Sequence, residues 1–266
     1  MKRLENAGWP RQKGFTLLEL MIVLLILSLI VGAVFSQLNL AQQRLSTEEN
    51  RLDDFQQARD FVDQFFRDIN QIGTPNAQLF DLTQTFSPAL DTSALYPLPA
   101  HWTSPYVNDS RFAVGLTSIG SGEIHFEGSM NGDGTVQSVV YKINGSGSCA
   151  LCMQRSQVNK VGGVDPLTQA TNWGTEVNDI ISATVFTYYA YDGTQVTPPS
   201  GSTLDYTTQA GAQSLASIKT VQINLTIRNP NVVDKQTGLP IETSFEGEVS
   251  LNNCSMLATG QNMSCQ

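Results

Sequence analysis

The feature that most constrains this chain is an apolar run of 23 residues, Phe15 to Gln37, in which Glu19 is the one charged residue. No Pro interrupts the run, and Gly32 is its only Gly. As a helix it would be about 35 Å long, enough to cross a hydrocarbon core of about 30 Å. The sequence therefore predicts one membrane-spanning helix near the N-terminus.

Charge is distributed unevenly around this run. Residues 1–14 carry a formal charge of +3 and the other 252 residues carry −12, for a total of −9. Because basic residues collect on the cytoplasmic side of spanning helices, we expect residues 1–14 in the cytoplasm and the body outside it. An ordinary cleaved secretory signal is disfavoured, since the apolar run is too long and no A-x-A-like site follows it. A body this acidic repels phosphate backbones, so no nucleic-acid partner is expected.

After the apolar run, apolar side chains recur at steps of three, four and seven residues. They are Leu38, Ala41, Leu45, Leu52, Phe55, Val62, Phe65, Ile69 and Ile72. Charged residues lie between them, which is typical of an amphipathic helix with one buried stripe. Gly73 and Pro75 end the pattern. We expect one long helix whose first half, residues 15–38, spans the membrane and whose second half, residues 39–72, is amphipathic.

Residues 73–266 are predicted to form an extracytoplasmic, β-rich globular domain. Period-two alternation, or enrichment in β-branched and aromatic residues, indicates strands at 111–116, 122–128, 135–143, 180–191, 221–228 and 245–251. We expect residues 73–110 to be a long, partly packed loop and residues 196–214 to be a mobile insertion. A sheet with one apolar face needs a second layer, and the striped half of the helix supplies it. The predicted fold class is therefore α+β, a long N-terminal helix packed on an antiparallel β-sheet.

The residues around Glu19 form a specific pattern. The stretch KGFTLLELMIVLLILSLI joins Gly14, the aromatic Phe15 and an acid at the fifth position after the Gly14–Phe15 bond. A carboxylate inside a spanning helix costs roughly 2.5–3.5 kcal/mol, so its presence needs a reason. The stretch resembles the class III signal of type IV pilins and type II secretion pseudopilins, over about 30 residues of the chain.

This resemblance implies a short leader, residues 1–14, that prepilin peptidase removes after Gly14 before it methylates the new N-terminal Phe15. It also implies that Glu19 pairs with the N-terminal amine of a neighbouring subunit, because each charge is less costly in lipid as half of a pair. The implied partners are prepilin peptidase, other pilin or pseudopilin subunits, the inner-membrane assembly platform and the membrane. The implied location is the bacterial inner membrane, with one span and a periplasmic C-terminal domain, and then the pilus or pseudopilus.

In layout the chain is most similar to PilW-type minor pilins and J-type minor pseudopilins. Major pilins commonly have a helix-breaking Pro where this chain has Ser36, and the body is large for a repeated shaft subunit. The tip pseudopilin of secretion systems typically lacks the acid that is present here as Glu19. The resemblance therefore implies a place near the filament tip or in the initiation complex. The alternative is a membrane-anchored extracytoplasmic binding module or an adhesin-like tip domain.

The four cysteines suit an oxidising compartment, where disulfides persist. We favour pairing Cys149 with Cys152 and Cys254 with Cys265, because each pair consists of neighbours in sequence. Three pairings are possible, and a four-cysteine zinc site is the competing interpretation. The segment that contains Cys149 and Cys152 is predicted to be a hairpin rather than a redox site at the start of a helix.

Other candidate sites have weaker sequence support. Glu123, His125 and Glu127 alternate along one strand face and could hold a metal, but a polar outer face explains them equally well. The NGDG loop at 131–134 lacks the calcium-loop pattern that ends in Glu and is explained by an ordinary turn. With two histidines and no nucleophile motif, we expect a structural subunit that has no catalytic residues, metal or cofactor.

Overall fold

The computed structural model describes residues 16–75, 109–145, 151–182, 184–233 and 238–251. The chain divides into two compact units, residues 1–50 and 51–266. Helix α1, Leu17–Asn70, begins in the first unit and supplies its last turns to the second. Gly73, with a φ of 75°, follows the end of α1 in the left-handed conformation that commonly terminates helices.

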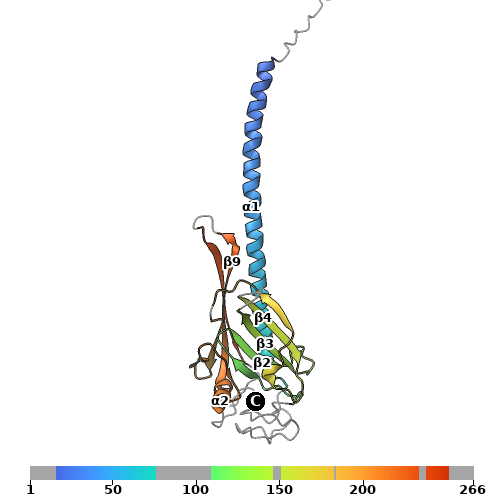
Figure 1. Cartoon of the computed structure of the whole chain (residues 1–266), viewed down its shortest axis with the longest axis vertical. Coiled ribbons are helices and arrows are strands. Elements are labelled where there is room, and N and C mark those ends of the chain that lie inside the picture. Colours follow the sequence, from blue (N-terminus) through green and yellow to red (C-terminus); the bar gives the residue numbers. More distant parts are fainter. Residues whose placement is uncertain (1–15, 76–108, 146–150, 183, 234–237, 252–266) are drawn as a thin grey trace, which may run out of the picture. The chain divides into compact units, whose positions relative to one another are not determined.

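The second unit contains two antiparallel sheets (Figure 1). The six-stranded sheet has the order β5 (Trp173–Val177), β4 (Cys152–Asn159), β3 (Gln137–Asn144), β2 (Glu123–Gly128), β1 (Leu116–Ile119) and β8 (Leu204–Asp205). The four-stranded sheet has the order β10 (Pro240–Ser250), β9 (Ile218–Val233), β6 (Phe186–Ala190) and β7 (Gln195–Val196). A 3-10 helix, η3 (Pro166–Thr168), and helix α2 (Gln209–Ser217) lie between strands. The α+β class is confirmed, but the sequence predicted one sheet and the structure has two.

The last turns of α1 pack against both sheets at once. Ala58, Phe61, Phe65 and Ile69 recur at helical spacing and are at most 2% exposed. The ring of Phe65 stacks on Phe186 of β6 at 5.2 Å between centroids and meets Tyr141 of β3 edge-on at 5.4 Å. Burying each such aromatic side chain stabilises the fold by roughly 1.5–3 kcal/mol. This stripe is therefore what joins the two sheets into one core.

Four of the six predicted strands are confirmed as β2, β3, β9 and β10, with ends shifted by a few residues. The prediction for 111–116 is wrong, because β1 begins at Leu116. Asp109 folds the preceding residues into a turn: its side chain accepts a hydrogen bond from the Arg111 N–H at 2.9 Å, and its carbonyl accepts one from the Phe112 N–H at 3.2 Å. The prediction for 180–191 is correct only from Phe186, where β6 begins.

The prediction of a mobile insertion at 196–214 is also wrong. The segment contains β8 and most of α2, and the side chain of Tyr206 is fully buried. Helix α2 starts at a regular N-cap, where the Thr208 hydroxyl accepts a hydrogen bond from the Gly211 N–H at 3.1 Å. The other predicted loop, residues 73–110, lies mostly outside the described residues.

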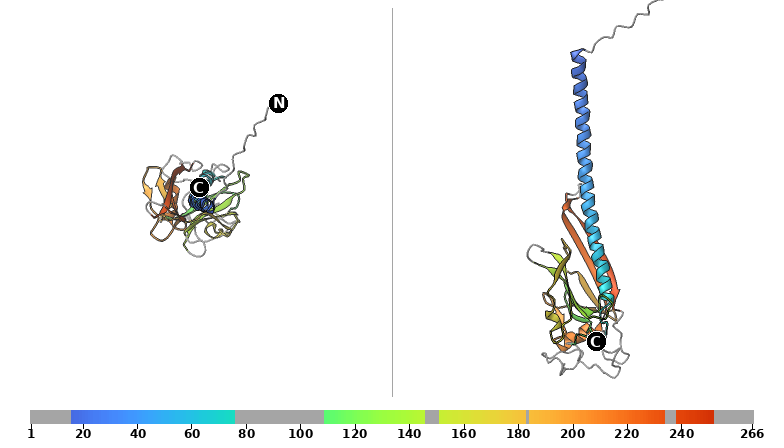
Figure 2. Two further views of the ribbon diagram at one scale, coloured as in Figure 1. Left: turned by 90° about the horizontal axis from the view of Figure 1, so that it is seen from above. Right: turned by 90° about the vertical axis from the view of Figure 1, so that its right-hand side faces the viewer.

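The longest strands, β9 and β10, form a hairpin paired from Thr220↔Ser250 to Val233↔Pro240. Figure 2 shows this hairpin running beside the last turns of α1. The rings of Phe55 on α1 and Phe245 on β10 are in contact, with centroids 5.1 Å apart. The helix thus covers one face of the hairpin.

Candidate assembly helix and polar centres

The first turn of α1 holds Glu19 in a capping box. The Thr16 hydroxyl oxygen, just before the first helical residue, accepts a hydrogen bond from the Glu19 N–H at 3.3 Å. The Glu19 carboxylate accepts in return from the Thr16 N–H and hydroxyl, each at 3.3 Å. Such reciprocal bonds satisfy donors that the first turn of a helix leaves without an intrahelical partner. Glu19 therefore stabilises the start of α1 within its own subunit.

The part of α1 from Leu17 to Leu38 presents apolar side chains in every direction. From Leu17 to Leu38 each large apolar side chain is exposed, from 42% at Val31 to 77% at Leu17. By length and composition α1 is able to cross a membrane. A helix that is apolar on all sides needs lipid or other apolar helices around it. Either environment makes the carboxylate of Glu19 costly unless it gains a cationic partner.

In the second unit, a buried polar centre joins α1 to the six-stranded sheet. Asp68 Oδ2 accepts hydrogen bonds from Tyr141 Oη at 2.7 Å and from Arg155 Nη2 and Nε at 2.6 and 2.9 Å. Gln64 Nε2 donates to the other oxygen of Asp68 at 2.7 Å. Burial raises the pKa of Tyr141 well above its ordinary range, and the nearby Asp68 adds to the effect, so the phenol stays a donor. These bonds fix how α1 is rotated against β3 and β4.

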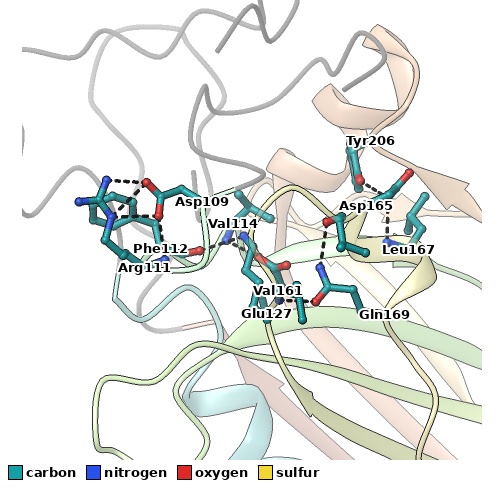
Figure 3. A network of polar contacts seen from close by, with 12 residues as sticks. Asp109, Arg111, Phe112, Val114, Glu127, Val161, Asp165, Leu167, Gln169 and Tyr206 are labelled. Atoms are coloured by element: carbon teal, nitrogen blue, oxygen red, sulfur yellow. Dashed lines mark hydrogen bonds and ion pairs between the residues drawn. The ribbon is translucent and has the colours of Figure 1, made fainter. Parts of the chain in front are cut away.

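A second buried polar centre surrounds Glu127 at the end of β2 (Figure 3). Glu127 Oε2 accepts hydrogen bonds from Lys160 Nζ at 2.7 Å and from the Val114 N–H at 3.1 Å, and both charged side chains are 0% exposed. Lys160 Nζ also donates to the Phe112 carbonyl at 2.9 Å. Burial raises the pKa of Glu127, although the attraction of Lys160 opposes that rise. The pair ties the turn before β1 to the loop after β4.

Asp165 extends this polar region beyond Glu127 (Figure 3). Its Oδ1 accepts hydrogen bonds from the Leu167 N–H at 2.9 Å and from Tyr206 Oη at 2.6 Å. Gln169 holds the same loop, accepting from the Val161 N–H at 2.8 Å. Burial, reinforced by the bond to Asp165, raises the pKa of Tyr206 far above its ordinary value. The contact explains why Tyr206 is buried in a segment that the sequence predicted to be a loop.

Of the three side chains considered as metal ligands, two contact each other and the third binds Lys160. His125 Nε2 contacts Glu123 Oε1, and this hydrogen bond lowers the pKa of Glu123, whereas Glu127 binds Lys160. Within the described ranges, no group of three or more His, Cys, Asp or Glu side chains is placed to hold a metal ion. In the NGDG loop, Asp133 Oδ1 accepts from the Thr135 N–H at 2.8 Å, which is the ordinary turn that the sequence predicted.

The N-terminal segment matches a known family model. Residues 9–35 match the model described as "Prokaryotic N-terminal methylation motif". The chain carries a class III prepilin leader. This leader is that of type IV pilins and pseudopilins, and it implies processing by prepilin peptidase and assembly with other pilins. No curated protein and no solved structure matches the chain.

Most of the predicted site residues lie outside the part of the chain that the structure describes. Gly14, Phe15, Cys149, Cys254 and Cys265 lie outside the described residues. Cys152, at the start of β4, is disulfide-bonded, and the pairing of the four cysteines stays a prediction. The predicted hairpin around it is confirmed by the antiparallel pairing of β3 with β4, in which Asn144 lies opposite Cys152.

Sequence reasoning missed three functional or structural polar groups. The capping box was detectable, because Thr16-x-x-Glu19 before an apolar run is a known helix-start pattern. Asp68 with Arg155 and Glu127 with Lys160 were not, since the partners lie 87 and 33 residues apart. No local pattern connects residues at such separations.

Proposed function

We propose that this chain is a minor pilin or pseudopilin that is cleaved after Gly14, methylated on Phe15 and assembled through α1. It enters a type IV pilus or a type II secretion pseudopilus, near the tip or in the initiation complex. Residues 1–14 are then the leader, 15–38 the spanning and assembly half of the helix, 39–72 its amphipathic half, and 73–266 the periplasmic domain. The observation that carries the proposal is the leader match at residues 9–35, which runs directly into α1.

The geometry of Glu19 supports a role between subunits. Both side-chain contacts to Thr16 use Oε2 and are long, at 3.3 Å, and no contact of Oε1 is found among the described residues. Cleavage creates a cationic amine on Phe15, close to this carboxylate in sequence. A cation and an acid in an apolar bundle are each costly alone and far less costly together. A neighbouring subunit displaced along the filament axis supplies that amine to Oε1.

Two features support a minor rather than a shaft position. Ser36 lies inside α1, whereas major pilins commonly have a helix-breaking Pro there, so this helix continues without a break. The second unit, residues 51–266, is large for a subunit that repeats along a shaft. A subunit that occurs once or a few times, at an end, has room for such a body.

Mass spectrometry of the membrane-extracted N-terminus tests the proposal, in strains with and without the prepilin peptidase. The expected chain begins at Phe15 with one added methyl group when the peptidase is present, and at Met1 when it is absent. Recovery of chains that begin at Met1 in both strains would overturn the proposal.

Variants at Glu19 separate pairing between subunits from helix capping. Glu19→Gln keeps an N3 side chain that can complete a capping box but removes the charge. Thr16→Ala removes the cap and keeps the charge. We expect Glu19→Gln to be inserted and processed but to enter filaments poorly, while Thr16→Ala enters them almost normally. Normal incorporation of Glu19→Gln, measured by immunoblotting of sheared filaments, contradicts the pairing.

A further inference from the structure

The outer edge of β10 is a long strand edge without a partner strand among the residues that the structure describes. Strand β10 is 11 residues long and ends the four-stranded sheet, with β9 as its one neighbour. In a strand at the edge of a sheet, alternate residues direct their backbone N–H and C=O groups away from the neighbouring strand. The open side of the strand therefore presents a row of these groups. Long edges of this kind are templates for an additional strand.

The apolar layer under this edge is incompletely covered. On the face toward α1, Thr243 and Phe245 of β10 are half-buried, whereas their β9 partners Ile227 and Leu225 are only 5% and 0% exposed. Phe55 of α1, which touches Phe245, is 43% exposed. We call Phe55, Ile241 and Phe245, together with the open edge beside them, the β10 margin. One more strand beside β10 would complete the cover of these side chains.

The opposite face of β10 is acidic. Glu242, Glu246 and Glu248 are exposed, and their side chains point away from α1 because they alternate with the residues that face it. Glu242 is paired with Arg228, and Glu246 accepts a hydrogen bond from Asn224 at 3.4 Å. The acidic face therefore carries more negative charge than β9 neutralises.

We propose that the β10 margin accepts a strand from a different protein, in which apolar side chains alternate with Lys or Arg. The apolar side chains of that strand would lie over Phe55 and Phe245, and its cations would lie beside the glutamates of β10. This proposal extends the proposed function and depends on it in one respect: the protein that donates the strand is then a neighbouring subunit or a tip-associated protein.

The charges on β10 disfavour two other occupants of this edge, namely β10 of a second copy and another segment of the same chain. Antiparallel pairing of β10 with β10 of a second copy would bring the three glutamates of each copy together, and like charges across strands destabilise pairing. Residues 76–108 and 252–266 of this chain contain neither Lys nor Arg, so they offer no cation to the glutamates. A basic strand from another protein satisfies both faces of the edge.

Hydrogen exchange of the mature full-length chain in detergent micelles tests the proposal directly. The probe is an 11-residue synthetic peptide in which Val and Lys alternate, matched in length to β10. The control peptide has the same composition, with its Val and Lys residues in two blocks. We expect saturable binding of the alternating peptide, together with slower amide exchange in residues 240–250, and neither effect with the control peptide.

Matched charge variants show whether the acidic face selects the peptide. The triple variant Glu242→Gln, Glu246→Gln, Glu248→Gln should bind it about tenfold more weakly, since three favourable cross-strand pairs are lost. The control, Asp53→Asn, Asp60→Asn, Asp63→Asn, changes the net charge equally on α1 and should bind like the parent chain. Equal weakening in both triples, no protection in β10, or a dimer linked through β10 would overturn the proposal. These outcomes do not depend on cleavage at Gly14, so they are distinguishable from failure of the proposed function.

Discussion

Replacing Asp68 with Ala tests the claim that a buried polar centre fixes α1 against the six-stranded sheet. The substitution leaves Arg155, whose side chain is 14% exposed, without its charge partner and removes the acceptor of the Tyr141 and Gln64 hydrogen bonds. Removing one member of a buried ion pair costs about 3–5 kcal/mol. The lower end applies, because Arg155 Nε keeps its hydrogen bond to Tyr141 Oη at 2.9 Å. We therefore expect a loss of about 3 kcal/mol in the free energy of unfolding.

Two further variants provide reference values for the expected loss in the free energy of unfolding. Tyr141→Phe removes the hydrogen bond that Tyr141 donates to Asp68 and the one that it accepts from Arg155 Nε, which keeps its bond to Asp68. It should cost about 1.5–3 kcal/mol. Arg228→Ala breaks the exposed pair with Glu242, in which the side chains are 46% and 47% exposed, and should cost about 0–1 kcal/mol. The assay is urea unfolding of the mature chain in detergent, followed by near-ultraviolet circular dichroism, with an unchanged m-value as the sign of comparable unfolding. If Asp68→Ala costs no more than Arg228→Ala, the polar centre does not fix the helix.

Two further predictions concern the region around β1. Glu127→Ala should lower the free energy of unfolding by about 3–5 kcal/mol, because it leaves Lys160 buried without its partner. Combining Glu127→Leu with Lys160→Met should recover part of this loss, since an apolar pair replaces the buried charges but no longer binds the Val114 N–H and the Phe112 carbonyl. A double variant that is as unstable as Glu127→Ala in thermal unfolding would contradict this. The hydrogen bond from Arg111 holds the pKa of Asp109 below its ordinary 3.8, so the stability that Asp109 contributes is present above about pH 3.8 and is lost as the pH falls through the lower folded value. In Arg111→Ala the free energy of unfolding should therefore depend less on pH below about pH 3.8, as measured by acid unfolding. An unchanged acid-unfolding curve would exclude the Asp109–Arg111 pair as the cause of this pH dependence.

The elements that the sequence predicted correctly are those whose burial is periodic. In helix α1 the predicted stripe is buried at Phe65 and Ile69, whereas the predicted Leu45 and Leu52 are 64% and 58% exposed. Strand β9 alternates apolar and polar residues where one of its faces is in the core. Strand β4 is less apparent, because its buried positions include Ser156, which is 0% exposed and breaks the apolar pattern. Its eight paired positions with β3, rather than its side-chain pattern, define it as a strand.

The second sheet and the polar centres depend on contacts between distant residues. Phe65 has partners on both sheets, Tyr141 on β3 and Phe186 on β6. No local feature of the sequence shows that one helix stripe packs against two layers. The buried hydroxyl of Tyr206 donates a hydrogen bond to Asp165, which lies 41 residues away in the sequence. Local propensity cannot predict such pairings, since tertiary contacts determine them.

The two acids considered on α1 differ in how completely their surroundings satisfy them, and this difference favours Glu19 as the assembly residue. Asp68 receives short hydrogen bonds on both oxygens and faces a cation, so it has nothing to gain from an external partner. Glu19 has two long contacts on one oxygen and lies among exposed apolar side chains that require an apolar environment. In that environment its charge is tolerable only beside a cation. A capping box is sufficient to start the helix but supplies no positive charge. We therefore propose that the charge comes from the N-terminal amine of a neighbouring subunit.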